Sequence, residues 1–128
     1  MAHRSRLAGF IIDCQTDDLD AAANFWSRAL GVSVADRDAG DDTAEYQMFG
    51  NTPGDLQIEV QKVQHPSRVH LDIEADDLDA EATRLEALGA KKIGFVKRWW
   101  VMEAPTGQRF CIVKMKYPER GASPNVWP

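Results

Sequence analysis

The chain has 128 residues, of which 44% are hydrophobic and 27% are charged, and its formal net charge is −5. This length and composition are typical of one soluble globular domain with a single core. No apolar run approaches the ~20 residues that a membrane-spanning helix needs. The acidic balance and the absence of a basic stripe argue against nucleic acid and anionic membranes as partners. We therefore expect neither nucleic acid nor a membrane as partner.

The N-terminus and the cysteines predict the compartment. The apolar stretch that follows the basic N-terminal residues is interrupted at Asp13, which is too early for a signal peptide. The only two cysteines, Cys14 and Cys111, form neither a disulfide framework nor a CxxC metal pattern. These features predict a cytoplasmic protein.

An internal repeat organises the chain. The sequence Asp-Asp-Leu-Asp-Ala occurs at residues 17–21 and again at residues 76–80, and Ala-Leu-Gly occurs at residues 29–31 and again at residues 87–89. In each copy an Asp before the first turn favours the start of a helix, and the glycine favours its end. The matched order of two motifs indicates a duplication of one structural unit.

The first copy, at about residues 7–63, begins with an expected strand at 7–14. A helix at 19–30 follows, because apolar residues recur there with helical spacing. Gly and Pro turn signals then separate three expected strands at 32–35, 43–49 and 56–63.

The second copy, at about residues 68–115, repeats this order with a strand at 68–74 and a helix at 78–88. Three further strands are expected at 92–96, 99–102 and 109–115. The tail at 116–128 contains several prolines and is expected to be irregular, with Trp127 able to pin it to a neighbouring surface. The fold class is therefore α+β, built from two βαβββ modules. A ferredoxin-like fold, the alternative, has two helices for four strands.

Strand alternation assigns side chains to faces. His70 and Asp72 share one face of their strand, and Leu71 and Ile73 lie on the other. By the repeat, Asp13 is the counterpart of Asp72. Polar residues on one face indicate either a solvated concave surface or an ordinary half-exposed sheet, and both interpretations stay open.

Several motifs together resemble a known family. They are Arg-Val-His-Leu-Asp-Ile-Glu at 68–74, Ala-Pro-Thr-Gly-Gln-Arg-Phe-Cys at 104–111, and Ile-Asp-Cys at 12–14 with Phe-Trp at 25–26. Over residues 7–115 the chain resembles a glyoxalase-like protein of the vicinal-oxygen-chelate (glyoxalase/bleomycin resistance/dioxygenase) superfamily. The resemblance implies a curved, cup-like mixed sheet with the helices on its convex face. It does not imply one activity, because this fold carries isomerases, epimerases, dioxygenases, thiol transferases and drug-binding proteins.

The resemblance also implies a metal site with one ligand from the first strand and one from the last strand of each module. These positions fall on Ile11, Glu59, His70 and Cys111. Isoleucine cannot coordinate an ion, and a thiolate is unlike the oxygen and imidazole ligands that manganese, nickel or iron take in such octahedral sites. Glu59, His70 and Cys111 suit zinc better. The alternative is that no metal binds, with Cys111 a small apolar strand residue.

Other candidate site residues follow from their chemistry. His70 is a candidate general acid or base, and Asp72 is a candidate for orienting its imidazole. Asp13 and Asp72 are equally explained as buried hydrogen-bonding residues. Trp99 and Trp100 are adjacent in a strand, so one is expected beneath the helix while the other can stack on a planar ligand.

Two functions stay open. The first is a metal-independent protein that binds a small molecule in the cup through Asp13, Glu59, His70, Asp72, Trp99 or Trp100, and Cys111. The second is an enzyme of lyase, isomerase or dioxygenase type on a small organic substrate. It would be metal-assisted through Glu59, His70 and Cys111, or would use His70 in acid–base catalysis. The resemblance implies a homodimer, because family members often pair modules across subunits. The alternative is a monomer, because a chain with both modules can close its own cup.

Overall fold

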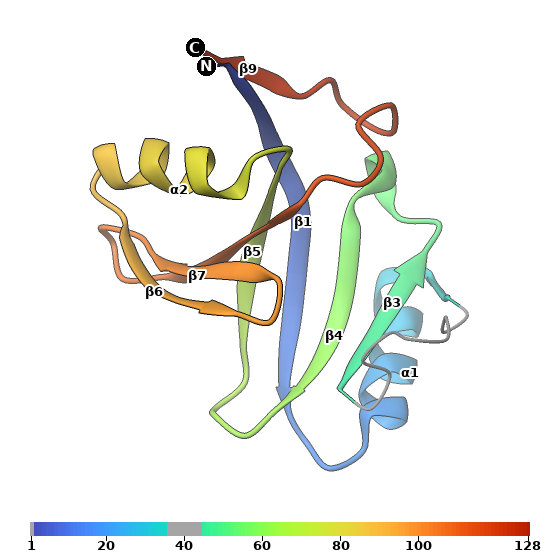
Figure 1. Ribbon diagram of the computed structural model, residues 1–128. Helices are drawn as coiled ribbons and strands as arrows, with labels where there is room; N and C mark the ends of the chain where they lie inside the picture. The colour runs from blue at the N-terminus through green and yellow to red at the C-terminus, as the bar shows by residue number, and fades with distance from the viewer. Residues whose placement is uncertain (1, 36–44) are drawn as a thin grey trace. The chain divides into compact units, whose positions relative to one another are not determined.

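The computed structural model describes residues 2–35 and 45–128, which form nine strands and two α-helices (Figure 1). The elements follow one another as β1 (His3–Gln15), α1 (Leu19–Leu30), β2 (Ser33–Val34), β3 (Tyr46–Gly50), a 3-10 turn (Pro53–Asp55), β4 (Gln57–Val63), β5 (Arg68–Ala75), α2 (Leu78–Ala87), β6 (Lys91–Val96), β7 (Trp99–Glu103), β8 (Arg109–Lys114) and β9 (Asn125–Trp127). This order confirms an α+β fold with two βαβββ modules. The turn expected between the strands at 32–35 and 43–49 lies outside the described residues, as do residues 43 and 44 of the second of these strands.

The chain divides into two compact units, one around each helix. Residues 10–69 form the unit that we call the α1 unit, and residues 1–9 and 70–128 form the α2 unit. β1 and β5 each contribute residues to both units.

In the α1 unit the strand order is β2–β3–β4–β1. α1 begins at Asp18, whose side chain accepts a hydrogen bond of 3.0 Å from the backbone N–H of Ala21. It ends at Gly31, whose φ of 70° is unstrained only for glycine. The apolar side of the helix packs on Ile58 and Val60 of β4. The predicted bounds of this helix are therefore confirmed.

In the α2 unit the strand order is β1–β5–β8–β7–β6, with β9 paired to β1. β5 and β8 are parallel, and the pairs β8–β7 and β7–β6 are antiparallel. α2 begins at Asp77, which accepts a 3.0 Å hydrogen bond from the N–H of Ala80, and it ends one residue before the predicted position. The core of the α2 unit includes Ala82, Met102 and Ile112, each with no exposed surface.

The prediction of an irregular tail is wrong at its end. Residues 125–127 form β9, which lies antiparallel to the start of β1 with His3 opposite Trp127. The indole N–H of Trp127 donates a 2.8 Å hydrogen bond to Oγ of Ser5. These three residues contain no proline, so they are free to pair as a strand, and Trp127 pins the tail as expected.

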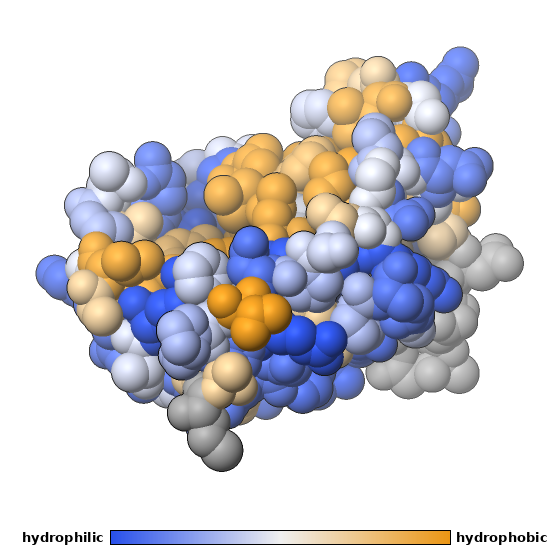
Figure 2. All heavy atoms as spheres, turned by 90° about the horizontal axis from the view of Figure 1, so that it is seen from above, coloured by the Kyte–Doolittle hydropathy of each residue, from blue (hydrophilic) through white to orange (hydrophobic). Residues whose placement is uncertain are grey.

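Exposure on β5 is the reverse of the usual pattern. Val69 and Leu71 are 60% and 53% exposed, whereas Asp72 and Glu74 are 6% and 3% exposed. The apolar cluster beneath α2 includes Ile73 and Ala75 but not Leu71, so the helix covers only the end of this strand. On β5, therefore, the face that carries Asp72 and Glu74 is buried, and Val69 and Leu71 on the opposite face are exposed to solvent. Other apolar side chains also reach the surface, and appear in orange in Figure 2.

No helix among the described residues has both the length and the apolar character needed to cross a membrane.

Candidate functional site

Three polar side chains of the α2 unit gather on one face of the β5–β8 pair. His70 and Asp72 lie two residues apart on β5 and therefore point to the same side. Cys111 of β8 is the direct partner of Asp72 in the parallel register. The potential ligand atoms of the three side chains all lie within 4.8 Å of one another. Backbone register alone thus brings together an imidazole, a carboxylate and a thiol.

Burial distinguishes the three groups. Asp72 is 6% exposed, and His70 and Cys111 are half-buried. A carboxylate at this depth is costly unless a neighbour donates a hydrogen bond or carries positive charge. Nε2 of His70 lies 3.6 Å from Oδ1 of Asp72, close enough for a charge interaction if the imidazole is protonated. This arrangement is suited to holding a proton or a polar group of a ligand.

The metal site that the resemblance implies does not fit these residues. Ile11 is 2% exposed and has no donor atom, and Glu59 belongs to the α1 unit. The cluster in the α2 unit has Asp72 as its third donor instead. Nitrogen, oxygen and sulfur donors form a zinc-type set rather than an octahedral oxygen set. Ligands about 2.0–2.3 Å from a shared zinc ion lie within about 4.5 Å of one another, so small side-chain adjustments would let His70, Asp72 and Cys111 hold one.

The two neighbouring tryptophans lie on opposite faces of β7. Trp100 packs against the apolar cluster beneath α2, and its indole N–H donates a 2.9 Å hydrogen bond to Oδ1 of Asp79. Val101 is paired with Cys111 and shares its face, and Trp99, two residues away, lies on that face too. Trp99 is therefore the tryptophan on the side of the cluster, and the prediction of one tryptophan beneath a helix is confirmed.

Asp13 and Glu59 belong to the α1 unit and are described there. Asp13 is 2% exposed, and its Oδ2 lies 3.8 Å from Nε of Arg68. Glu59 is half-buried on β4, opposite Met48 of β3. Both partners of this contact belong to the α1 unit.

Arg6 was missed by the sequence analysis. Its Nε donates a 2.6 Å hydrogen bond to Oε1 of Glu74, which lies on the same face of β5 as His70 and Asp72. A neighbouring pair has the same form, with Arg4 Nε 3.0 Å from Oδ2 of Asp76. The equal spacing of Arg4 and Arg6 on β1, and of Glu74 and Asp76 at and just beyond the end of β5, was the available signal.

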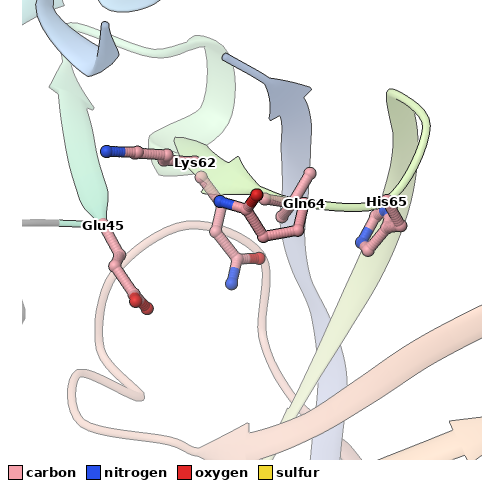
Figure 3. Close-up of a pocket in the computed structure, with 6 residues that line it drawn as sticks. Glu45, Lys62, Gln64 and His65 are labelled. Atoms are coloured by element: carbon pink, nitrogen blue, oxygen red, sulfur yellow. The ribbon is translucent and has the colours of Figure 1, made fainter. Parts of the chain in front are cut away.

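A surface hollow of about 480 Å³ lies in the α1 unit, at the ends of β3 and β4 (Figure 3). Its lining residues are Glu45, Gln61, Lys62, Val63, Gln64 and His65. The labelled side chains do not converge on one point in Figure 3. None of the predicted site residues lines this hollow.

Comparison with known families gives one match. Residues 9–113 match the family described as "Glyoxalase-like domain". No match to the sequence was found among curated proteins.

Solved structures share the fold. Methylmalonyl-CoA epimerase from Mycobacterium tuberculosis is 18% identical, with a TM-score of 0.61 over 86% of this chain and 87% of that chain. The Mn(II)-bound glyoxalase from Novosphingobium aromaticivorans is 16% identical, with a TM-score of 0.57 over 91% of this chain and 43% of that one. Homoprotocatechuate 2,3-dioxygenase from Brevibacterium fuscum, in complex with 3,4-dihydroxyphenylacetate, is 17% identical, with a TM-score of 0.55 over 95% of this chain and 38% of that one. At these identities the likeness concerns the fold alone.

Proposed function

The chain belongs to the glyoxalase-like domain family, and on that basis we propose that it binds a small organic molecule on the β5–β8 face of the α2 unit. His70, Asp72 and Cys111 orient the molecule in this proposal. The convergence of their polar atoms within 4.8 Å carries it. Buried polar groups that converge beside apolar surface are the usual pattern of a small-molecule site.

The chemistry of the face supports a ligand with at least one hydrogen-bonding group. His70 is able to donate or accept a proton, and a carboxylate of Asp72 accepts hydrogen bonds. Trp99 offers a planar ring on the same face for stacking. The proposal needs no ion at the position of Ile11, which has no donor atom.

A fragment screen tests this function. We expect hits from a library of several hundred small polar aromatic fragments, detected by saturation-transfer NMR. Asp72→Asn and His70→Gln should weaken their binding about tenfold, because each removes a charged or proton-exchanging partner. Asp17→Asn, at an exposed aspartate before α1, is the matched control and should leave binding unchanged. Hits whose affinity is equal in all variants would contradict the proposal.

The same three donors favour a second function, a metal-assisted enzyme acting on a small organic substrate. A zinc ion held by His70, Asp72 and Cys111 would supply Lewis-acid chemistry or an activated water when bound. The support for this alternative is the donor set and its 4.8 Å span.

Metal content separates the two functions. The metal-assisted function predicts about one zinc per chain after chelator treatment and zinc incubation, measured by mass spectrometry. Cys111→Ser and His70→Ala should each lose that zinc, whereas Cys14→Ser should retain it. If zinc, manganese, nickel and iron all fail to bind the wild type, the metal-assisted function is excluded.

A further inference from the structure

Arg6 of β1 holds the C-terminal segment of the α2 unit through the backbone of that segment. Its guanidinium donates to the carbonyl oxygens of Tyr117 at 2.8 Å, Pro118 at 3.3 Å and Ala122 at 2.5 Å. Its Nε donates to Glu74 at the same time, and the side chain of Arg6 is only 12% exposed. One guanidinium therefore joins three carbonyl groups of the tail to a buried carboxylate of β5.

The position of Glu74 places this junction beside the candidate site. Glu74 and Asp72 point to the same side of β5, and they lie about 7 Å apart along the strand at its usual rise. The tail carbonyls that surround Arg6 therefore lie at the Glu74 end of the face that carries His70, Asp72 and Cys111.

Both ends of the segment are fixed to the sheet. Before it, the backbone N–H of Met115 donates a 2.9 Å hydrogen bond to the carbonyl of Ala75. After it, β9 pairs with β1, and the guanidinium of Arg84 lies 3.9 Å above the ring of Trp127. Figure 1 shows the chain leaving β8 and returning through β9 to the start of β1.

The middle of the segment, residues 116–124, is not held by buried side chains. No side chain between residues 116 and 124 is buried. Its attachment rests on the hydrogen bonds from Arg6 rather than on an apolar core. Segments with few buried apolar contacts open locally at a lower free energy than the core does.

We propose that residues 116–124 form a strap, fastened by Arg6, that closes the Glu74 end of the ligand site and opens without unfolding of the α2 unit. The strap limits how far a ligand can extend along β5 beyond Asp72. This inference rests on the ligand site proposed above for its role, but the fastening and the opening concern the ligand-free protein.

Limited proteolysis tests the fastening, because trypsin can cut after Lys116 and Arg120 within the strap. Arg6→Gln/Glu74→Gln removes the guanidinium together with its buried carboxylate partner, so no unpaired buried charge remains. We expect cleavage at these two sites to be about tenfold faster than in the wild type, since several charge-assisted hydrogen bonds are lost. Arg4→Gln/Asp76→Asn removes the neighbouring, more exposed ion pair of the same form, and it is the matched control that should stay near the wild-type rate. Equal rates in the double variant and the wild type would overturn the proposal.

Hydrogen exchange tests the opening in the unmodified protein. The N–H of Arg120 is hydrogen-bonded to the carbonyl of Tyr117 inside the strap. Its exchange should be independent of low concentrations of urea, whereas amides of β8 should exchange with the full urea dependence of global unfolding. Full urea dependence at Arg120 would mean that the strap opens only when the unit unfolds, and would also overturn the proposal.

The size of thiol reagents tests the closing role. A bulky N-substituted maleimide should modify Cys111 more slowly than N-ethylmaleimide does in the wild type. In Arg6→Gln/Glu74→Gln the ratio of the two rates should approach the ratio that the same reagents show with a free cysteine. Cys14 of the α1 unit is the internal control, and its ratio should not change. An unchanged ratio at Cys111 would show that the strap does not close the site. None of these readouts uses a ligand, so a failed fragment screen would leave them intact.

Discussion

Glu81 is a charged side chain without exposed surface, and its partners explain how the two ends of the chain are held to α2. Its carboxylate accepts hydrogen bonds from Arg84 at 2.7 and 2.8 Å, and it lies 2.8 Å from Nε2 of His3. Burial alone would raise the pKa of Glu81, but hydrogen bonds from Arg84, His3 and Ser5 outweigh burial and lower it. A carboxyl group whose pKa is lower in the folded state stabilises the fold above its ordinary pKa, which is about 4.5 for Glu81, and this stability is lost as the pH falls.

Replacing Glu81 tests this account at the scale of one residue. Glu81→Gln should lower the free energy of unfolding at pH 7 by about 3 kcal/mol, because His3 and Arg84 lose a buried partner. It should also flatten the decline in stability below pH 4.5 relative to the wild type. Urea unfolding at pH 7 and at pH 3.5 measures both effects. Glu86→Gln, on the exposed side of the same helix, should change stability by less than about 0.5 kcal/mol. Equal acid sensitivity of Glu81→Gln and the wild type would contradict the account.

Residue types identified most of the candidate site, but they could not identify its buried ion pairs. The repeat paired Asp13 with Asp72, and the family resemblance singled out His70 and Cys111 as possible ligands. Neither gave a sign that Arg6 would lie against Glu74, since an arginine in a strand is ordinarily taken as exposed. The contact depends on the pairing of β1 with β5, which one strand alone does not show.

At the scale of elements, the two helices were the most accurately predicted parts because their ends have local causes. Asp18 and Asp77 each cap a helix with the same hydrogen bond to the N–H three residues later. The strands were less accurate, since β2 covers only Ser33–Val34 and β9 was not predicted. Strand ends depend on partners that are distant in the sequence, and the partner of β9 lies at the other end of the chain.

Gly31 gives a direct test of the helix ends. Its φ of 70° is strained for any residue with a Cβ, although no atom lies within 4 Å of the position that a Cβ would take. Gly31→Ala should therefore lower the free energy of unfolding by about 1 kcal/mol through backbone strain alone. Gly94→Ala is the matched control, because Gly94 also has open space around it but no positive φ. Thermal unfolding of both variants should separate them, and equal stability would contradict this explanation of the helix end.

At the scale of the whole molecule, this chain has the fold of its family but not the full set of metal ligands that the resemblance implies. The order of elements and the match over residues 9–113 establish the glyoxalase-like architecture. The donor set does not follow it, because Ile11 is apolar and the cluster of His70, Asp72 and Cys111 lies within the α2 unit alone. A fold depends on many apolar positions and tolerates a change at any one of them. A metal site depends on a few ligands, so the loss of one ligand can abolish it.

The central claim is that the β5–β8 face of the α2 unit carries the functional site. An amide chemical-shift map of the ¹⁵N-labelled protein with the best fragment hit tests it most directly. We predict that the largest shifts fall on residues 70–72 and 110–112 and on the indole N–H of Trp99. The largest shifts on Glu45, Lys62 and Gln64, around the hollow of the α1 unit, would contradict the claim.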